Sequence, residues 1–255
     1  MKGFIQEYGN IIVVVAVILL MLLFVKTGFA KNIQDAILGS ADHIVETGEN
    51  IVPKQVKASD TIDIEGTEYV VLEERGNNQA LVMTVRSIWN RTFQSSARTD
   101  GQNQSTYEGS EIDNYLENNW YKGLSAKMRN AIQPTSIKQA SYATYNDPDS
   151  KQETGYNGQV YNTIDRHVFL PSVSEIGKAV DLKNNDKVKA FLHVEYMSIW
   201  TRDSYQDYAD VAEYLDSGYG GLGNNYVNAT NGVRPAFVID LSQVNYTVTG
   251  HTDYK

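Results

Sequence analysis

Five acidic residues gather in one short stretch, "DSYQDYADVAEYLD", and are the first candidates for chemistry. Clustered carboxylate oxygens can bind a hard cation or a sugar, and two carboxylates that face one substrate can catalyse glycoside hydrolysis. The stretch lacks the ligand spacing of a calcium loop, so we interpret it as a solvated acidic loop or helix face. Its members are Asp203, Asp207, Asp210, Glu213 and Asp216.

The other residue types that carry chemistry are scattered along the chain. The four histidines stand singly, so no pair has the spacing of metal ligands. The chain has no cysteine, which excludes disulfides, thiolate metal sites and a cysteine nucleophile. No Gly-x-Ser-x-Gly motif and no phosphate-binding loop occurs. We therefore expect no catalytic residue, no metal and no cofactor, in a protein that is not an enzyme.

Tyrosine and charge point to the kind of partner. The chain of 255 residues carries a net charge of −9 without a basic run, which argues against nucleic acid. Its seventeen tyrosines either form a contact surface for a glycan or protein ligand or simply suit a loop-rich β protein. We expect any contact surface on the polar loops 90–107, 141–160 and 203–231. The candidate contact residues are Tyr145, Tyr156, Tyr205, Tyr208, Tyr219 and Tyr226.

The N-terminal segment contains fifteen consecutive apolar residues, Ile11 to Val25. Such a helix rises about 22 Å, and apolar neighbours extend it toward the roughly 30 Å hydrocarbon core of a bilayer. Apolar residues continue at helical spacing, so we expect one long hydrophobic helix over 1–47 that contacts membrane lipid. Three fates compete: an uncleaved anchor, cleavage after Gly3, or removal of a secretory signal after Ala30.

The motif "EYGNIIVVVAVILL", followed by "GFAKNIQDAI", resembles the pilins of tight-adherence systems and, more loosely, type IV pilins. Those proteins carry a glycine, a short gap and then Glu-Tyr at the head of an apolar helix, here Gly3, Phe4, Glu7 and Tyr8. The gap is one residue shorter than in pilins. The resemblance implies cleavage after Gly3 and self-association through the helix, with the Glu7 carboxylate opposite a neighbour's amine.

The body is expected to alternate short strands and short helices with long polar loops. The apolar residues on either side of "GNN" predict a hairpin, and "GVRPAFVIDL" is expected to hold a short apolar strand. Ser110, Ser125 and Ser172 stand where short helices should begin, as capping residues. Its blocks "YEGSEIDNYLENNWYKGLSAKMRNAIQPTSI", "HVFLPSVSEIGKAV", "SIWTRDS" and "NGVRPAFVIDL" resemble an uncharacterised domain of exported proteins from Gram-positive gut bacteria. This likeness spans about residues 60–242. The last two blocks also resemble the closing strands of the C-type-lectin-like fold. The resemblance implies an α+β fold: a long N-terminal hydrophobic helix and a C-type-lectin-like mixed sheet domain with short helices and long loops.

Three large side chains of the body are expected to be structural. Trp120 should anchor its helix, and Trp200 should lie in the core. Arg234, in "GVRPAF", should use its five donors to tie loop carbonyls and a carboxylate together.

These observations predict a helix over 1–47, a linker over 48–60, a lectin-like domain over 61–245 and a C-terminal tail over 246–255. The predicted function is that of a non-catalytic structural or adhesive protein, membrane-anchored or pilin-like. Its globular domain would lie outside the cell membrane or on a surface pilus. The alternatives are a membrane-anchored enzyme that acts on cell-wall or host glycans and a structural component of a conjugation or secretion machine.

Overall fold

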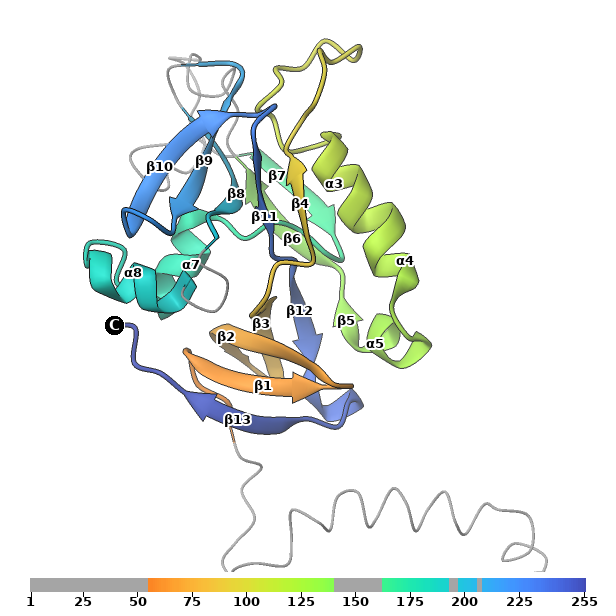
Figure 1. Cartoon of the computed structure of the whole chain (residues 1–255). Coiled ribbons are helices and arrows are strands. Elements are labelled where there is room, and N and C mark those ends of the chain that lie inside the picture. The colour runs from red at the N-terminus through yellow and green to blue at the C-terminus, as the bar shows by residue number, and fades with distance from the viewer. Residues whose placement is uncertain (1–54, 140–161, 193–196, 206–207) are drawn as a thin grey trace, which may run out of the picture. The chain divides into compact units, whose positions relative to one another are not determined.

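The described part of the chain is built on two larger β-sheets, one above the other in Figure 1. The computed structural model describes residues 55–255 apart from 140–161, 193–196 and 206–207. The lower sheet is antiparallel, with the strand order β13-β1-β2-β3-β12-β5. Its strands are β1 (Asp60–Ile64), β2 (Thr67–Gly76), β3 (Gln79–Thr84), β5 (Ile132–Gln133), β12 (Ala236–Asp240) and β13 (Thr247–His251).

Strands β3 and β12 run through the middle of this sheet and are apolar along almost their whole length. Nearly every residue of "QALVMT" and "AFVID" is buried. Strands that protein covers on both faces lose the alternation of apolar and polar residues, which explains these continuous apolar runs. The two strands therefore supply much of the core.

The turn between β2 and β3 follows from its residue types. Asn77 and Asn78 have φ angles of 49° and 61°, in the left-handed region that asparagine tolerates better than most residues. Two central residues with positive φ match the right-handed twist of a hairpin. The hairpin predicted from "GNN" is confirmed, since β2 and β3 pair antiparallel across this turn.

The upper sheet has the strand order β10-β9-β8-β11-β4. Strand β11 runs parallel to β8 and antiparallel to β4, which forms one edge of the sheet. A separate pair of strands, β6 and β7, completes the β-structure of the described ranges. The bounds are β4 (Trp89–Thr92), β6 (Thr135–Gln139), β7 (Asn162–Arg166), β8 (Ile199–Ser204), β9 (Val211–Asp216), β10 (Gly221–Tyr226) and β11 (Thr230–Val233).

Short helices join the strands, and serines begin three of them. The side chains of Ser110, Ser125 and Ser172 each accept a hydrogen bond from a backbone N–H of the first turn. The predicted caps are thereby confirmed. The helical elements are α3 (Glu111–Tyr115), the π-helical turn η1 (Leu116–Trp120), α4 (Tyr121–Gly123), α5 (Ala126–Ala131), α7 (Val173–Ala179), α8 (Asn185–Leu192) and the 3-10 turn η3 (Leu241–Gln243).

The predicted α+β class is wrong, because the described residues form mainly β-sheet with a few short helices. In these ranges the longest single α-helix, α8, has eight residues. The stretch 203–231, expected as a polar loop, contains the hairpin β9–β10 and the strand β11. Its acidic, tyrosine and asparagine side chains hide the alternation that marks a strand. The predicted long helix followed by a C-type-lectin-like mixed sheet domain is corrected accordingly.

The predicted helix over 1–47, with Gly3, Phe4, Glu7 and Tyr8, lies outside the described residues. None of the helices within 55–255, as far as that part is described, is long and apolar enough to cross a membrane. Residues 246–255, expected as a tail, supply the strand β13, which pairs with β1.

Candidate ligand-binding site

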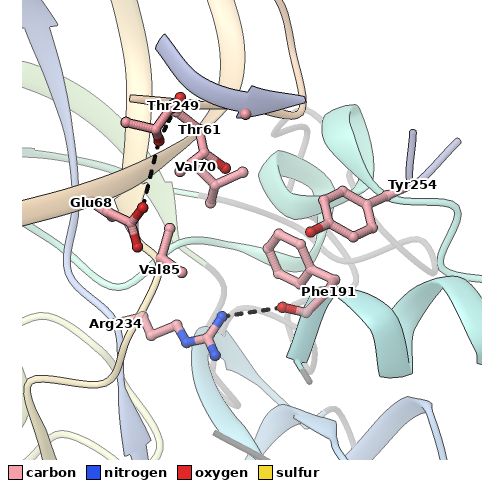
Figure 2. A pocket seen from close by; sticks show the side chains of 9 residues that line it. Thr61, Glu68, Val70, Val85, Phe191, Arg234, Thr249 and Tyr254 are labelled. Atoms are coloured by element: carbon pink, nitrogen blue, oxygen red, sulfur yellow. Dashed lines mark hydrogen bonds between the residues drawn. The ribbon is translucent and has the colours of Figure 1, made fainter. Parts of the chain in front are cut away.

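A cavity of about 220 Å³ lies between the lower sheet, the end of α8 and the C-terminal residues (Figure 2). Its walls differ in character. Figure 2 shows Glu68, Thr61 and Thr249 on one side and the rings of Phe191 and Tyr254 on the other. The lining residues are Thr61, Glu68, Val70, Val85, Phe191, Arg234, Thr249, Gly250 and Tyr254.

The polar wall is formed by side chains from three neighbouring strands, β13, β1 and β2. The Thr249 hydroxyl lies 3.3 Å from the Thr61 carbonyl oxygen and 3.5 Å from Oε1 of Glu68. A hydroxyl has one proton, so Thr249 donates to one of these acceptors at a time. The exposed Glu68 carboxylate therefore keeps acceptor capacity for a ligand donor.

The apolar wall is aromatic. Phe191, the seventh residue of α8, is almost fully buried. The Tyr254 ring meets it edge to face, with ring centroids 5.4 Å apart, within the roughly 4.5–7 Å range that such pairs prefer. Val70 and Val85 add aliphatic surface to the same cavity. Together these groups offer an apolar face opposite the carboxylate.

Arg234 lies beside the cavity in the connection between β11 and β12, and its side chain is buried. Its Nη1 donates to the Phe191 carbonyl oxygen at 3.4 Å, and its guanidinium carbon lies 5.9 Å from the centre of the Phe191 ring. Arg234 therefore joins the strands to the end of α8, through a helix carbonyl where a loop carbonyl was expected.

The predicted contact tyrosines separate into two places. Tyr205 and Tyr208 stack with ring centroids 6.1 Å apart. The Tyr205 N–H donates to the carbonyl of Val211, which pairs with Tyr226, so these three tyrosines lie at one end of the β9–β10 hairpin. Tyr219 belongs to the turn at the opposite end. Tyr145 and Tyr156 lie outside the described residues.

The acidic stretch is only partly solvated, so the interpretation as an exposed loop or helix face is wrong. Asp203 is buried on β8, and Glu213 is 6 % exposed on β9. Burial raises the pKa of Asp203 to about 6, although Arg202 opposes the shift, and raises the pKa of Glu213 to about 8. Asp207 lies outside the described residues, and Asp210 and Asp216 are partly exposed.

These two carboxyl groups are incompletely hydrogen-bonded. Oδ2 of Asp203 accepts from the Val173 N–H at 2.6 Å. Oδ1 of Asp203 and Oε2 of Glu213 have no hydrogen-bond partner in the described part of the chain. No cluster of three possible metal ligands occurs in that part either. Each of these two buried carboxyl groups therefore keeps one oxygen that the described residues do not satisfy.

An ion pair next to Asp203 connects several segments of the core. Two nitrogens of the buried Arg202 bind the Glu175 carboxylate at 2.6 and 2.8 Å. Arg202 also donates to the carbonyls of Lys138 and Leu170. Burial opposes ionisation of Glu175, but the adjacent guanidinium holds the pKa of this carboxyl below its usual value. Arg202 thus joins α7 and β8 to two other segments.

The tryptophans expected to be structural lie inside the domain. Trp200 is fully buried, contacts Phe93 and donates its indole N–H to the Arg91 carbonyl at 2.9 Å. Trp120 is partly buried and packs against Phe237, with ring centroids 6.1 Å apart.

The cavity could not be inferred from the sequence, because its lining residues lie between positions 61 and 254 and share no motif. Glu68 lies more than 180 positions before Thr249 and Tyr254 in the chain. Pairing of β13 with β1 brings them together. A signal in the sequence was the short run "TVT" of β-branched residues, which favours a strand and which the expectation of a tail overlooked.

A family model described as a domain of unknown function, DUF6273, matches residues 77–241. The matched region contains α7, β8 and β11, with Arg202 and Arg234, but excludes β1 and β13. No curated protein and no solved structure matches the chain. Neither result bears on the resemblance to pilins, which stays a prediction.

Proposed function

The chain belongs to the family of the domain of unknown function DUF6273, and from that premise we propose that it is a non-catalytic binding protein of the cell surface. In this proposal the cavity takes one sugar residue of a glycan. The observation that carries it is the pairing of a polar wall, with Glu68 and Thr249, and an aromatic wall, with Phe191 and Tyr254. Sugars present hydroxyl groups at their edges and apolar C–H groups on their faces, so both walls find a partner.

The size of the cavity supports a single ring as the ligand. Sites for drug-sized molecules measure roughly 300–1,000 Å³. At about 220 Å³ this cavity falls below that range, so it suits one residue of a longer chain. The remainder of a bound glycan would extend outside, past the exposed Glu68.

The carboxylate content supports binding over hydrolysis. Glycosidases use two carboxyl groups that flank the scissile bond. Among the nine described lining residues, Glu68 is the one carboxylate. For the enzymatic alternative a second carboxylate would have to face the same sugar.

The proposed location follows from the sequence. The apolar run Ile11–Val25 is suited to membrane lipid, and an acidic, tyrosine-rich body without cysteine suits an extracellular position. Two related alternatives are self-association in a pilus and a role in a conjugation or secretion machine. They differ from this proposal only in the partner that the chain binds.

A glycan array probed with the full chain in mild detergent tests the proposal. The chain should bind glycans that share a terminal residue. Glu68→Gln should weaken binding about tenfold, as expected for loss of a charge-assisted hydrogen bond. Tyr254→Ala should weaken it by removing the aromatic wall. Glu74→Gln, at an exposed carboxylate of the same strand, should bind like the wild type.

Two results would contradict the proposal. Equal binding by the wild type, Glu68→Gln and Tyr254→Ala would show that the glycan does not bind in the cavity. Release of sugar from a bound glycan would favour the enzymatic alternative.

A further inference from the structure

Two aromatic side chains and one arginine form a partly exposed surface, which we call the Trp89 platform: Trp89, Arg91 and Tyr115. Trp89 is 52 % exposed and begins β4, the edge strand of the upper sheet. Arg91 lies two residues further, on the same face of the strand. Tyr115 comes from α3, and its ring meets the Trp89 ring edge to face at 5.4 Å. Figure 1 separates β4 and α3 from β1 and β13 of the cavity.

Arg91 is held by aromatic rings alone. Its guanidinium carbon lies 4.7 Å from the centre of the Trp89 ring and 4.4 Å from the centre of the Tyr115 ring. In the described ranges its guanidinium makes no hydrogen bond or ion pair. Cation–π contacts use the ring faces and leave the N–H donors of the planar guanidinium unoccupied. The guanidinium of Arg91 is therefore held in place by the two rings, with its N–H donors still available for an anion.

This arrangement favours an anionic ligand. Arginine binds carboxylates through two parallel hydrogen bonds, and the two rings already restrict its rotamers. Binding therefore costs less side-chain entropy of the arginine than it would at a mobile surface arginine. Because the net charge of the whole chain is −9, general electrostatic attraction does not draw an anionic polymer to it. Binding of such a polymer would have to come from a local site.

We propose that the Trp89 platform recognises a carboxylated sugar of an acidic polysaccharide. The sugar ring packs on the exposed indole of Trp89, and its carboxylate binds the Arg91 guanidinium. A glycan is favoured over an acidic peptide because the indole offers a flat apolar surface directly beside the cation. A carboxylated sugar presents a ring and a carboxylate at that spacing, whereas an acidic peptide places its carboxylates on flexible side chains. This site is independent of the cavity and of the function proposed for it.

Titration of the full chain, in mild detergent, with polygalacturonate tests the inference. Calorimetry or the fluorescence of the exposed Trp89 reports binding. Arg91→Gln and Trp89→Ala should each weaken binding about tenfold, as expected for loss of a charge-assisted contact or of the apolar surface. Arg91→Lys keeps the charge but loses the fork, and it should also bind more weakly than the wild type.

Arg86→Gln is the matched control, because Arg86 is an exposed arginine five positions earlier without an aromatic contact. It should bind like the wild type, and neutral dextran should not bind. Thermal unfolding confirms that each variant is folded.

Three outcomes overturn the inference. Wild-type affinity in Arg91→Gln would show that Arg91 does not bind the carboxylate. Equal losses in Arg86→Gln and Arg91→Gln would show general charge attraction. Equal or tighter binding of poly-glutamate would identify an acidic peptide as the partner.

Discussion

The buried Glu213 should make the stability of this domain fall as the pH rises. A carboxyl group whose pKa is raised on folding is protonated in the folded chain while the unfolded chain has already lost its proton. Its contribution is therefore complete below the ordinary pKa of 4.5 and is lost as the pH rises to about 8, the value in the folded state. The substitution Glu213→Gln keeps the shape of the side chain and removes the titration.

The magnitude follows from linkage. Each pH unit between the two pKa values lowers the free energy of unfolding by about 1.4 kcal/mol. Asp203 contributes in the same sense, but its decline ends near pH 6, the pKa that burial gives it. The interval from pH 6 to pH 8 therefore isolates Glu213, and the expected decline there is roughly 3 kcal/mol. That is a large part of the roughly 5–15 kcal/mol by which a domain is stable.

Urea unfolding of the full chain at pH 5, 6, 7, 8 and 9, followed by circular dichroism, measures this dependence. At pH 5 Glu213→Gln should be less stable than the wild type, because an amide leaves a buried donor unsatisfied at a cost of about 1–3 kcal/mol. Its free energy of unfolding should change much less between pH 6 and pH 8. The two curves should therefore approach or cross at alkaline pH.

A matched control is Glu74→Gln, which removes an exposed carboxylate and should keep the wild-type slope. The reasoning would be refuted by a decline in Glu213→Gln as steep as that of the wild type. A wild-type stability that rises between pH 6 and pH 8 would refute it as well.

Two further substitutions test the core and the helix caps by urea unfolding at pH 7. Arg202→Met should cost about 3–5 kcal/mol, because it leaves the buried Glu175 carboxylate unpaired. Adding Glu175→Leu should recover part of that loss, and a double variant as unstable as the single one would contradict this role of the ion pair. Ser172→Ala should cost about 1 kcal/mol by removing the capping box of α7. Thr252→Ala, at an exposed hydroxyl outside α7, is its control, and an equal cost in both would argue against the cap.

Several local features could be predicted because neighbouring residues determine them. A serine side chain reaches the N–H groups of the turn that follows it, so Ser110 and Ser125 marked two helix starts. Asn77 and Asn78 supplied the positive φ angles of the β2–β3 hairpin. The short apolar run in "AFVID" indicated a strand.

The class of the fold and the candidate sites depended on contacts between distant parts of the chain. The segment 203–231 has the composition of a loop, yet it forms strands because β8 and β4 provide backbone partners for β9 and β11. Glu213 has no local feature that separates it from the partly exposed Asp216. Its burial follows from its position in a sheet that other segments cover.

The sequence by itself determined the β2–β3 turn, the helix caps, several short apolar strands and the absence of cysteine chemistry. Each of these depends on a residue's own type or on neighbours within one turn. Only the tertiary structure decided that β13 closes the cavity, that Asp203 and Glu213 are buried acids and that Arg91 lies between two rings. The pKa of a carboxyl group and the ligand of an arginine depend on which atoms surround them. Those atoms come from segments that folding, and not the order of residues, places nearby.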